Sequence, residues 1–155
     1  MKFPNFKLIA FRKKWDQLVA SGSDEDLFAA LPELDDEDPI SLVLYADSEI
    51  CNGGFFQYYS NGIFDVQEHV RALELVGLEP FAELVRESLA IFPNGIQPHR
   101  GDSEYPIEDE VARLIGGKNK FDELDDRYFV LTENLIPGVV AYVRRNSDHY
   151  WKMFE

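Results

Sequence analysis

Hydrophobic residues recur every three or four positions over most of the chain, and this spacing predicts helices rather than strands. The first predicted helix covers residues 5–20, with apolar positions on one face and basic groups on the other. Its apolar positions are Leu8, Phe11, Trp15, Leu18 and Val19. Ser23 is expected to cap a second, short helix through Leu31, and residues 32–38 form an acidic loop.

The middle of the chain begins with a helix that Asp38-Pro39 opens, because proline is favoured at the first helical position. This helix is expected to run to about Cys51, where Gly53-Gly54 interrupts it before a run of aromatic residues. Asn61-Gly62 is typical of a helix stop or a turn.

Two amphipathic helices are predicted next. Asp65 caps the first, which Gly77 closes, and Pro80 starts the second. The inward residues of the pair are Val66, Val70, Leu73 and Val76, followed by Phe81, Leu84, Val85 and Leu89.

The last third of the chain gives weaker signals. Residues 93–106 read as a long loop, and a short helix carrying Val111, Leu114 and Ile115 follows. Residues 121–131 fit helix or strand, and a final helix spans about residues 135–143. The prediction is an all-α protein: one compact domain over residues 1–155, built as a bundle of about six to eight helices, with a minor hairpin left open.

The charge of the chain is unevenly distributed. The net charge is −14, yet the first 14 residues hold five basic groups and no acid. From Trp15 to Val70 there are thirteen acidic residues and no lysine or arginine. Such a field repels nucleic acid and anionic membranes and attracts cationic proteins. We therefore expect a basic DNA-binding protein as the partner, and neither direct nucleic-acid binding nor membrane binding. Solubility alone also accounts for an acidic composition.

Cysteine content and hydropathy indicate the compartment. Cys51 is the only cysteine, which excludes a disulfide within the chain. No apolar run approaches the length of a membrane span, and basic residues occupy the place where a signal peptide is most apolar. The expected location is the cytoplasm.

No catalytic machinery is evident in the sequence. His69, His99 and His149 are far apart and form no zinc-binding motif, and His69 is expected to face solvent. The paired glycines lack the spacing of a phosphate-binding loop. We expect no enzyme, no cofactor and no metal, although the many carboxylates leave an acid/base pair open.

Residues 49–61 are the least generic part of the chain, because amides and a carboxylate alternate there with aromatic side chains. The residues concerned are Glu49, Asn52, Gly53, Gly54, Phe55, Gln57, Tyr58 and Asn61. Polar groups among aromatics must be hydrogen-bonded, so one interpretation is a buried network that fixes a helix junction. The alternative is a ligand-binding or enzymatic site centred on Glu49, Asn52 and Gln57.

This segment resembles the signature of a family of small acidic bacterial proteins named for a DNA-mimic member. The similarity includes Asn52-Gly53-Gly54-Phe55-x-Gln57-Tyr58, continues at Ala72-Leu73-x-x-x-Gly77, and covers roughly residues 40–150. Leu124-Asp125-Asp126-x-Tyr128-Phe129 and Tyr142-Val143-x-x-Asn146 are similar to its closing pattern. The resemblance implies an all-helical domain, often a homodimer, without known enzymatic activity. In the founding member, surface carboxylates imitate DNA phosphates and occupy the DNA-binding face of a transcriptional regulator.

Regularly spaced acids supply the means for such mimicry. Glu79, Glu83 and Glu87 are four residues apart, which places them about 6 Å apart along a helix axis. The surface is expected to extend through Asp65 and Glu68, and through the acidic helix start at Asp24, Glu25 and Asp26. The leading hypothesis is an acidic protein-binding module that occupies the DNA-binding face of a regulator or nucleoid protein. An immunity-type protein that neutralises a cationic toxin, such as a nuclease, is the alternative interaction.

Overall fold

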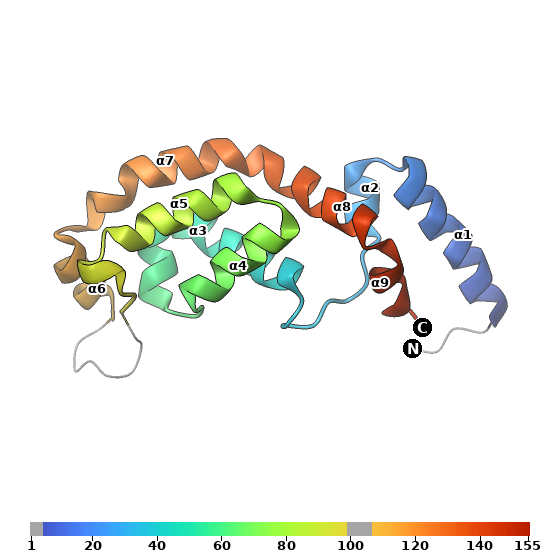
Figure 1. The fold of residues 1–155 in the computed structure, drawn as a ribbon, viewed down its shortest axis with the longest axis horizontal. Helices are drawn as coiled ribbons and strands as arrows, with labels where there is room; N and C mark the ends of the chain where they lie inside the picture. The colour runs from blue at the N-terminus through green and yellow to red at the C-terminus, as the bar shows by residue number, and fades with distance from the viewer. Residues whose placement is uncertain (1–4, 99–106) are drawn as a thin grey trace. The chain divides into compact units, whose positions relative to one another are not determined.

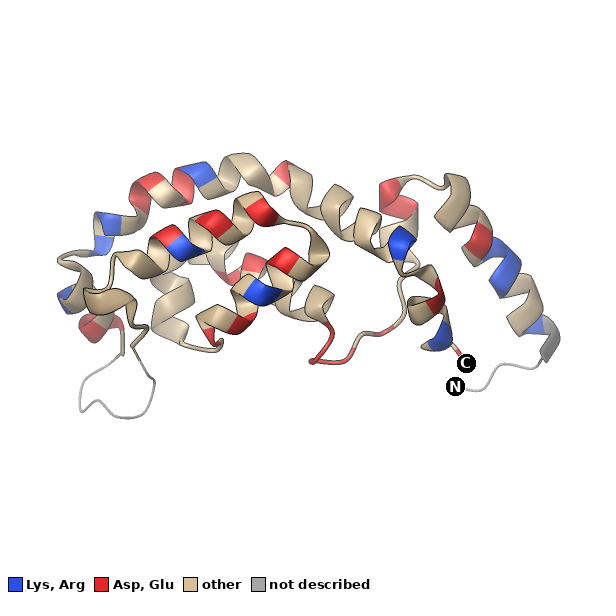
Figure 2. Cartoon of the chain, in the orientation of Figure 1, with Lys and Arg blue, Asp and Glu red and all other residues tan. Residues whose placement is uncertain are grey.

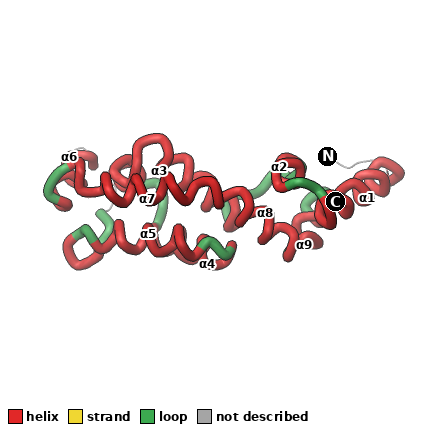
Figure 3. Tube along the Cα trace, turned by 90° about the horizontal axis from the view of Figure 1, so that it is seen from above, coloured by secondary structure: helices red, strands yellow, loops and turns green. Residues whose placement is uncertain are grey.

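A computed structural model describes residues 5–98 and 107–155, whose course is shown in Figure 1. Within these residues the chain forms nine α-helices and three short 3-10 helices. No strand occurs in the described residues, and helices and loops alone appear in Figure 3. The all-α prediction is confirmed, and the hairpin left open is not found in this part of the chain.

The helices divide between two compact units. Unit 1 contains the residues up to Asp36 together with Glu133–Glu155, and unit 2 is Glu37–Thr132. One domain over residues 1–155 therefore stays a prediction.

Unit 1 is built from α1 (Asn5–Ser21), α2 (Asp24–Ala29), α8 (Leu135–Arg145) and α9 (Ser147–Lys152). Aromatic rings join the first and last of these helices. Phe11 packs against Trp151 and Phe154 with ring centroids 5.8 and 4.9 Å apart, and the side chain of Trp15 is fully buried. The two predicted helices at the start of the chain are confirmed, and Ser23 caps α2 by accepting a hydrogen bond from the backbone N–H of Asp26. Helix α9 was not anticipated.

Arg144 of α8 ties the end of α1 in place. Its guanidinium donates hydrogen bonds to the backbone carbonyls of Leu18, Val19 and Gly22. The last carbonyls of a helix have no partner within the helix, so a half-buried arginine at this position satisfies several acceptors at once.

Unit 2 begins with α3 (Pro39–Asn61), whose start and end follow the sequence signals. Asp38 caps it, with 2.9 Å between its Oδ1 atom and the backbone nitrogen of Ile40, and Gly62 ends it in the left-handed conformation. The next two helices are α4 (Val66–Val76) and α5 (Glu79–Ala90), which pack against each other. Gly77, at φ 89°, closes α4 as predicted.

The rest of unit 2 comprises η1 (Pro93–Gly95), α6 (Ile107–Ile115), η2 (Lys118–Phe121) and α7 (Asp122–Leu131), with η3 (Thr132–Asn134) at the boundary. The ambiguous residues 121–131 are therefore largely helical. Most of the predicted loop of residues 93–106, and His99 with it, lies outside the described residues.

The core of unit 2 contains a cluster of aromatic rings. Tyr128 of α7 packs edge-to-face on Phe55 and on Phe81, with ring centroids 5.7 and 5.4 Å apart. Tyr59 packs edge-to-face on Phe92 and stacks on Phe121, with ring centroids 4.7 and 5.5 Å apart. Large rings bury much apolar area each, so this cluster holds α3, α5 and α7 together.

Candidate functional site

The segment that stood out in the sequence is a sharp kink inside α3. Gly53 and Gly54 leave helical geometry, with Gly54 at φ 70° and ψ −173°. That combination is open essentially to glycine alone. The helix resumes at Phe55. As the first residue of a new helical segment, Phe55 has a backbone N–H without an acceptor in its own helix, so the acceptor must come from elsewhere.

Asp125 of α7 provides that acceptor. The backbone nitrogen of Phe55 lies 2.8 Å from Asp125 Oδ1, although the two residues are 70 positions apart. A Cβ on Gly54 would clash with the Asp125 carboxylate, which occupies the space that a side chain would need. Burial raises the pKa of Asp125, whereas the bond from Phe55 favours its charged form. The Asp125 side chain, which belongs to α7, thus caps the start of the second half of α3.

The amide side chains of the motif bond to one carboxylate and to each other. Glu49 Oε2 accepts hydrogen bonds from Gln57 at 3.2 Å and from Asn61 at 2.5 Å. Gln57 in turn accepts a bond from Asn52 at 3.5 Å. These bonds run across the kink, from residues before it to residues after it. The geometry favours the structural interpretation over the ligand-binding one, because the polar groups are directed at one another. The network is not buried as expected: Asn52 is exposed, and the other three side chains are half-buried.

Three tyrosine hydroxyls complete the polar contacts of this core. Tyr58 bonds to His69 Nδ1 at 2.9 Å, and Tyr59 bonds to Ser88 Oγ at 2.7 Å. Tyr128 donates to Asp47 Oδ1 at 2.8 Å. Each bond links two helices, so the hydroxyls fix the mutual positions of α3, α4, α5 and α7 as well as filling the core.

The prediction that His69 faces solvent is wrong, because its side chain is fully buried. It lies three positions after Val66 and four before Leu73, on the inward face of α4. Burial lowers its pKa to about 4, and Nε2 has no hydrogen-bond partner among the described residues. The imidazole is therefore neutral in the folded protein at neutral pH.

Cys51 does not have the properties of a nucleophile. Cys51 is an exposed residue, but its thiol is partly shielded from water and points toward Asp47, with 3.7 Å between Sγ and Oδ1. Burial and the neighbouring carboxylate raise its pKa to about 11, so the thiolate is scarce at neutral pH. The residues that the structure describes also contain no group of three His, Cys, Asp or Glu side chains arranged to hold a metal ion. No described helix is long and apolar enough to cross a membrane.

The predicted acidic row on α5 is partly neutralised by arginines. Arg86 pairs with Glu79 at 2.9 Å and also with Glu74 on α4. The guanidinium nitrogens of Arg127, on α7, donate hydrogen bonds to both carboxylate oxygens of Glu87, at 2.6 and 2.9 Å. These bonds lower the pKa of Glu87. The interleaving of red and blue on α4 and α5 is visible in Figure 2.

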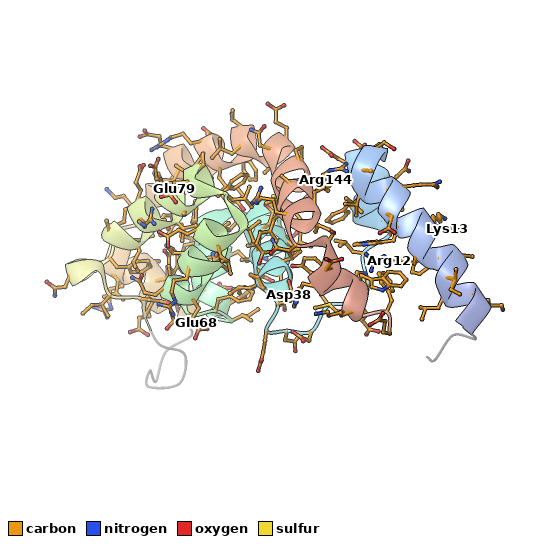
Figure 4. The ribbon with its side chains drawn as sticks, turned by 45° about the vertical axis from the view of Figure 1, so that its right-hand side comes forward. Arg12, Lys13, Asp38, Glu68, Glu79 and Arg144 are labelled. Carbon is orange, nitrogen blue, oxygen red and sulfur yellow. The ribbon has the colours of Figure 1, made fainter. Side chains whose placement is uncertain are left out.

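Glu83, in the middle of this row, is exposed and forms no ion pair with any residue that the structure describes. Glu68 is likewise exposed in the first turn of α4, where its backbone N–H donates to the capping Asp65 at 3.0 Å. We call α4 and α5, with the capping Asp65, the acidic hairpin; it carries six acidic and two arginine side chains. Figure 4 marks Glu68 and Glu79 on its two helices.

The acids at the start of α2 belong to unit 1. Asp24 lies 3.5 Å from the guanidinium of Arg144, whereas Glu25 and Asp26 are exposed. All three favour the start of their helix through its dipole. Their expected role in extending the acidic surface stays a prediction.

Sequence reasoning did not find Asp125 or Arg127 as determinants of this region. The contacts of Asp125 and Arg127 join residues 70 and 40 positions apart, so the sequence gives no local signal for them.

Comparison with known proteins identifies the family. The model of the DMP19-like protein family matches residues 29–146. No curated protein and no solved structure matches the chain. The matched residues include the kinked helix and the acidic hairpin, and they leave out α1 and α9. Since the match extends over well more than half of its length, the chain belongs to the DMP19-like family.

Proposed function

We propose that this protein is an acidic protein-binding module that occupies the DNA-contact surface of a cationic regulator or nucleoid protein, as a DNA mimic does. The observation that carries the proposal is the acidic hairpin, whose exposed carboxylates are held on two packed helices. Its inward residues are buried, including Val70 and Leu73 on α4 and Phe81 and Val85 on α5. A rigid support lets several charges bind a partner together without a further ordering cost.

Glu83 and Glu68 are the carboxylates best suited to contact a partner, because neither forms an ion pair with a described residue. Glu79 and Glu87 can still contribute. Their ion pairs with Arg86 and Arg127 are exposed to water, and exposed pairs stabilise a protein little. A cationic partner could therefore exchange its own side chains for these arginines. The family membership and the uneven charge of the chain support the same function.

Reversing two of these charges should weaken partner binding strongly. We expect Glu68→Lys/Glu83→Lys to lose affinity at least 30-fold, because two phosphate-like contacts become repulsive in a desolvated interface; the estimate takes about 1 kcal/mol or more for each lost contact. The immobilised wild type and variant would first recover basic proteins from a lysate of the source cells. The recovered partner would then be purified and bound to a labelled DNA duplex. Fluorescence anisotropy would show whether adding the acidic protein displaces the DNA from the partner.

The matched control is Glu108→Lys/Asp126→Lys, which also replaces one first-turn and one mid-helix exposed acid, on α6 and α7. This control should bind as the wild type does at the same ionic strength. A partner that binds both variants equally, or that holds DNA and this protein at once, would contradict the proposal. Recovery of a toxin whose nuclease site is covered would identify the immunity-type alternative instead.

A further inference from the structure

The chain contains three Asn-Gly pairs, at Asn52-Gly53, Asn61-Gly62 and Asn94-Gly95. This dipeptide is chemically labile, because a glycine without a Cβ lets its backbone nitrogen reach the side-chain carbonyl carbon of the asparagine before it. The covalent chemistry of the three pairs is the same. A difference in their reactivity must therefore come from the structure around each pair.

The two pairs in α3 are restrained by their surroundings. Asn61 is half-buried, and its amide donates a hydrogen bond to Glu49 Oε2 at 2.5 Å. The amide of Asn52 lies 3.5 Å from Gln57 Oε1, and the Gln57 side chain also covers Gly53, where a Cβ would clash with it. To react, either asparagine must break its side-chain bond and distort a packed helix.

Asn94 is not restrained in this way. It is exposed in η1, a turn of three residues, and its side chain forms no hydrogen bond with any residue that the structure describes. A Cβ on Gly95 would meet nothing within 4 Å, so the space beside this pair is open. The N–H of Gly95 donates to the Phe92 carbonyl at 2.9 Å. Opening such a bond in a short surface turn costs less free energy than opening a packed helix.

We propose that Asn94-Gly95 is a site of self-modification, at which the chain converts Asn94 to aspartate and isoaspartate. The backbone nitrogen of Gly95 gives its proton to hydroxide and attacks Cγ of Asn94. A bond forms between this nitrogen and Cγ, the bond from Cγ to the amide nitrogen breaks, and the amide nitrogen takes a proton from water and leaves as ammonia. The product is a five-membered succinimide ring.

Water then opens the ring at one of its two carbonyl carbons. Cleavage of the bond between the Gly95 nitrogen and Cγ gives aspartate at position 94. Cleavage of the bond between this nitrogen and the main-chain carbonyl carbon gives isoaspartate, in which the main chain runs through Cβ and Cγ. Both products carry a negative charge, and only isoaspartate lengthens the main chain, by one methylene group.

The place of Asn94 in the fold gives isoaspartate a structural consequence. Phe92, on one side of the turn, is buried in the core. On the other side, Gln97 accepts a hydrogen bond from the backbone nitrogen of Val66 at 3.0 Å and donates one to the Phe64 carbonyl at 2.7 Å. Gln97 thus fixes the turn that precedes α4. A longer main chain between Phe92 and Gln97 displaces the Gln97 side chain, so the first backbone N–H of α4 loses its acceptor.

The experiment follows deamidation of the full chain at pH 6 and pH 8 by mass spectrometry, which locates the mass gain of about 1 Da in the sequence. Asn94 should react at least about tenfold faster than Asn52 or Asn61, since small differences in opening free energy change the open population by such factors. The reaction should be faster at pH 8, because it needs a deprotonated nitrogen. Methyl transfer by an isoaspartyl methyltransferase measures the isoaspartate.

Two controls separate structure from covalent chemistry. In concentrated urea the three pairs should react at similar rates, because unfolding removes the restraints on Asn52 and Asn61. Gly95→Ala should slow the reaction at Asn94 alone, because the added methyl group crowds the attacking nitrogen. Equal rates at the three pairs in the folded chain, or the same ranking of rates in urea, would overturn the proposed site.

Hydrogen exchange tests the consequence for α4. The aged protein that carries isoaspartate should exchange the Val66 amide at least about tenfold faster than the fresh protein, because that amide has lost the Gln97 acceptor. Asn94→Asp is the matched control, since it adds the charge without lengthening the main chain, and should protect Val66 as the wild type does. Unchanged protection in the isoaspartate form would overturn the link between the modified turn and α4.

Discussion

Gly54→Ala should lower the free energy of unfolding by about 3 kcal/mol or more, the largest effect expected for a single methyl group in this protein. Two costs combine. The backbone at Gly54, with φ 70° and ψ −173°, lies where a residue with a side chain is strained. The added Cβ would also meet the Asp125 carboxylate, and displacing it would leave the buried N–H of Phe55 without its acceptor. Urea unfolding followed by far-UV circular dichroism measures the difference.

Gly95→Ala is the matched control, because Gly95 also has a positive φ, of 62°, but a Cβ there would touch nothing within 4 Å. It should cost about 1 kcal/mol, from backbone strain alone. Asp125→Ala makes room for the methyl group, so the double variant Gly54→Ala/Asp125→Ala should be less destabilised than the sum of the two single variants. Equal costs at Gly54 and Gly95 would show that the contact with Asp125 has no energetic weight.

Acidification from pH 7 to pH 5 should destabilise the protein by about 2 kcal/mol through His69 alone. The pKa of His69 is about 4 in the folded protein, against 6.5 for an ordinary histidine. As the pH falls below 6.5, the unfolded chain binds a proton that the folded chain excludes, so stability is lost until the pH reaches about 4. The pKa values of Asp47 and Asp125 are raised by burial and act in the opposite direction at lower pH.

The variant Tyr58→Phe/His69→Phe isolates this effect, because it removes both partners of the buried hydrogen bond together and leaves no hydroxyl unpaired. Denaturant unfolding at pH 7, 6 and 5 should show a shallower loss of stability for the variant than for the wild type, by the same 2 kcal/mol or so across the range. Parallel pH profiles would mean that His69 is protonated in the folded state, contrary to its burial.

Helix boundaries were predictable wherever the sequence carries a local chemical signal. Asp65 and Gly77 delimit α4 because a short polar side chain accepts a first-turn N–H, and glycine adopts the left-handed conformation at the end. The kink at Gly53-Gly54 was visible for the same reason. The buried face of α4 was also predictable. His69 is three residues after the inward Val66, and this spacing places the histidine on the same, buried face of the helix.

The pairing of the acidic row could not be predicted in full. Arg86 lies within the same helix as Glu79, but Arg127 reaches Glu87 from 40 positions away. Only packing of α5 against α7 brings them together. Residues four apart on a helix share a face whether or not tertiary partners neutralise them, so spacing alone overstates the charge that remains exposed.

The bond between Phe55 and Asp125 has a kinetic consequence. A helix usually receives its N-cap from the residue just before it, so its start can form early from local contacts. Here the cap of the second half of α3 is Asp125, which lies 70 positions later in the chain. Bringing the two ends of so long a loop together costs conformational entropy before the favourable contact forms. This cost slows folding. Chains that have not yet produced α7 therefore lack both the Asp125 acceptor for Phe55 and the packing of Tyr128 on its ring.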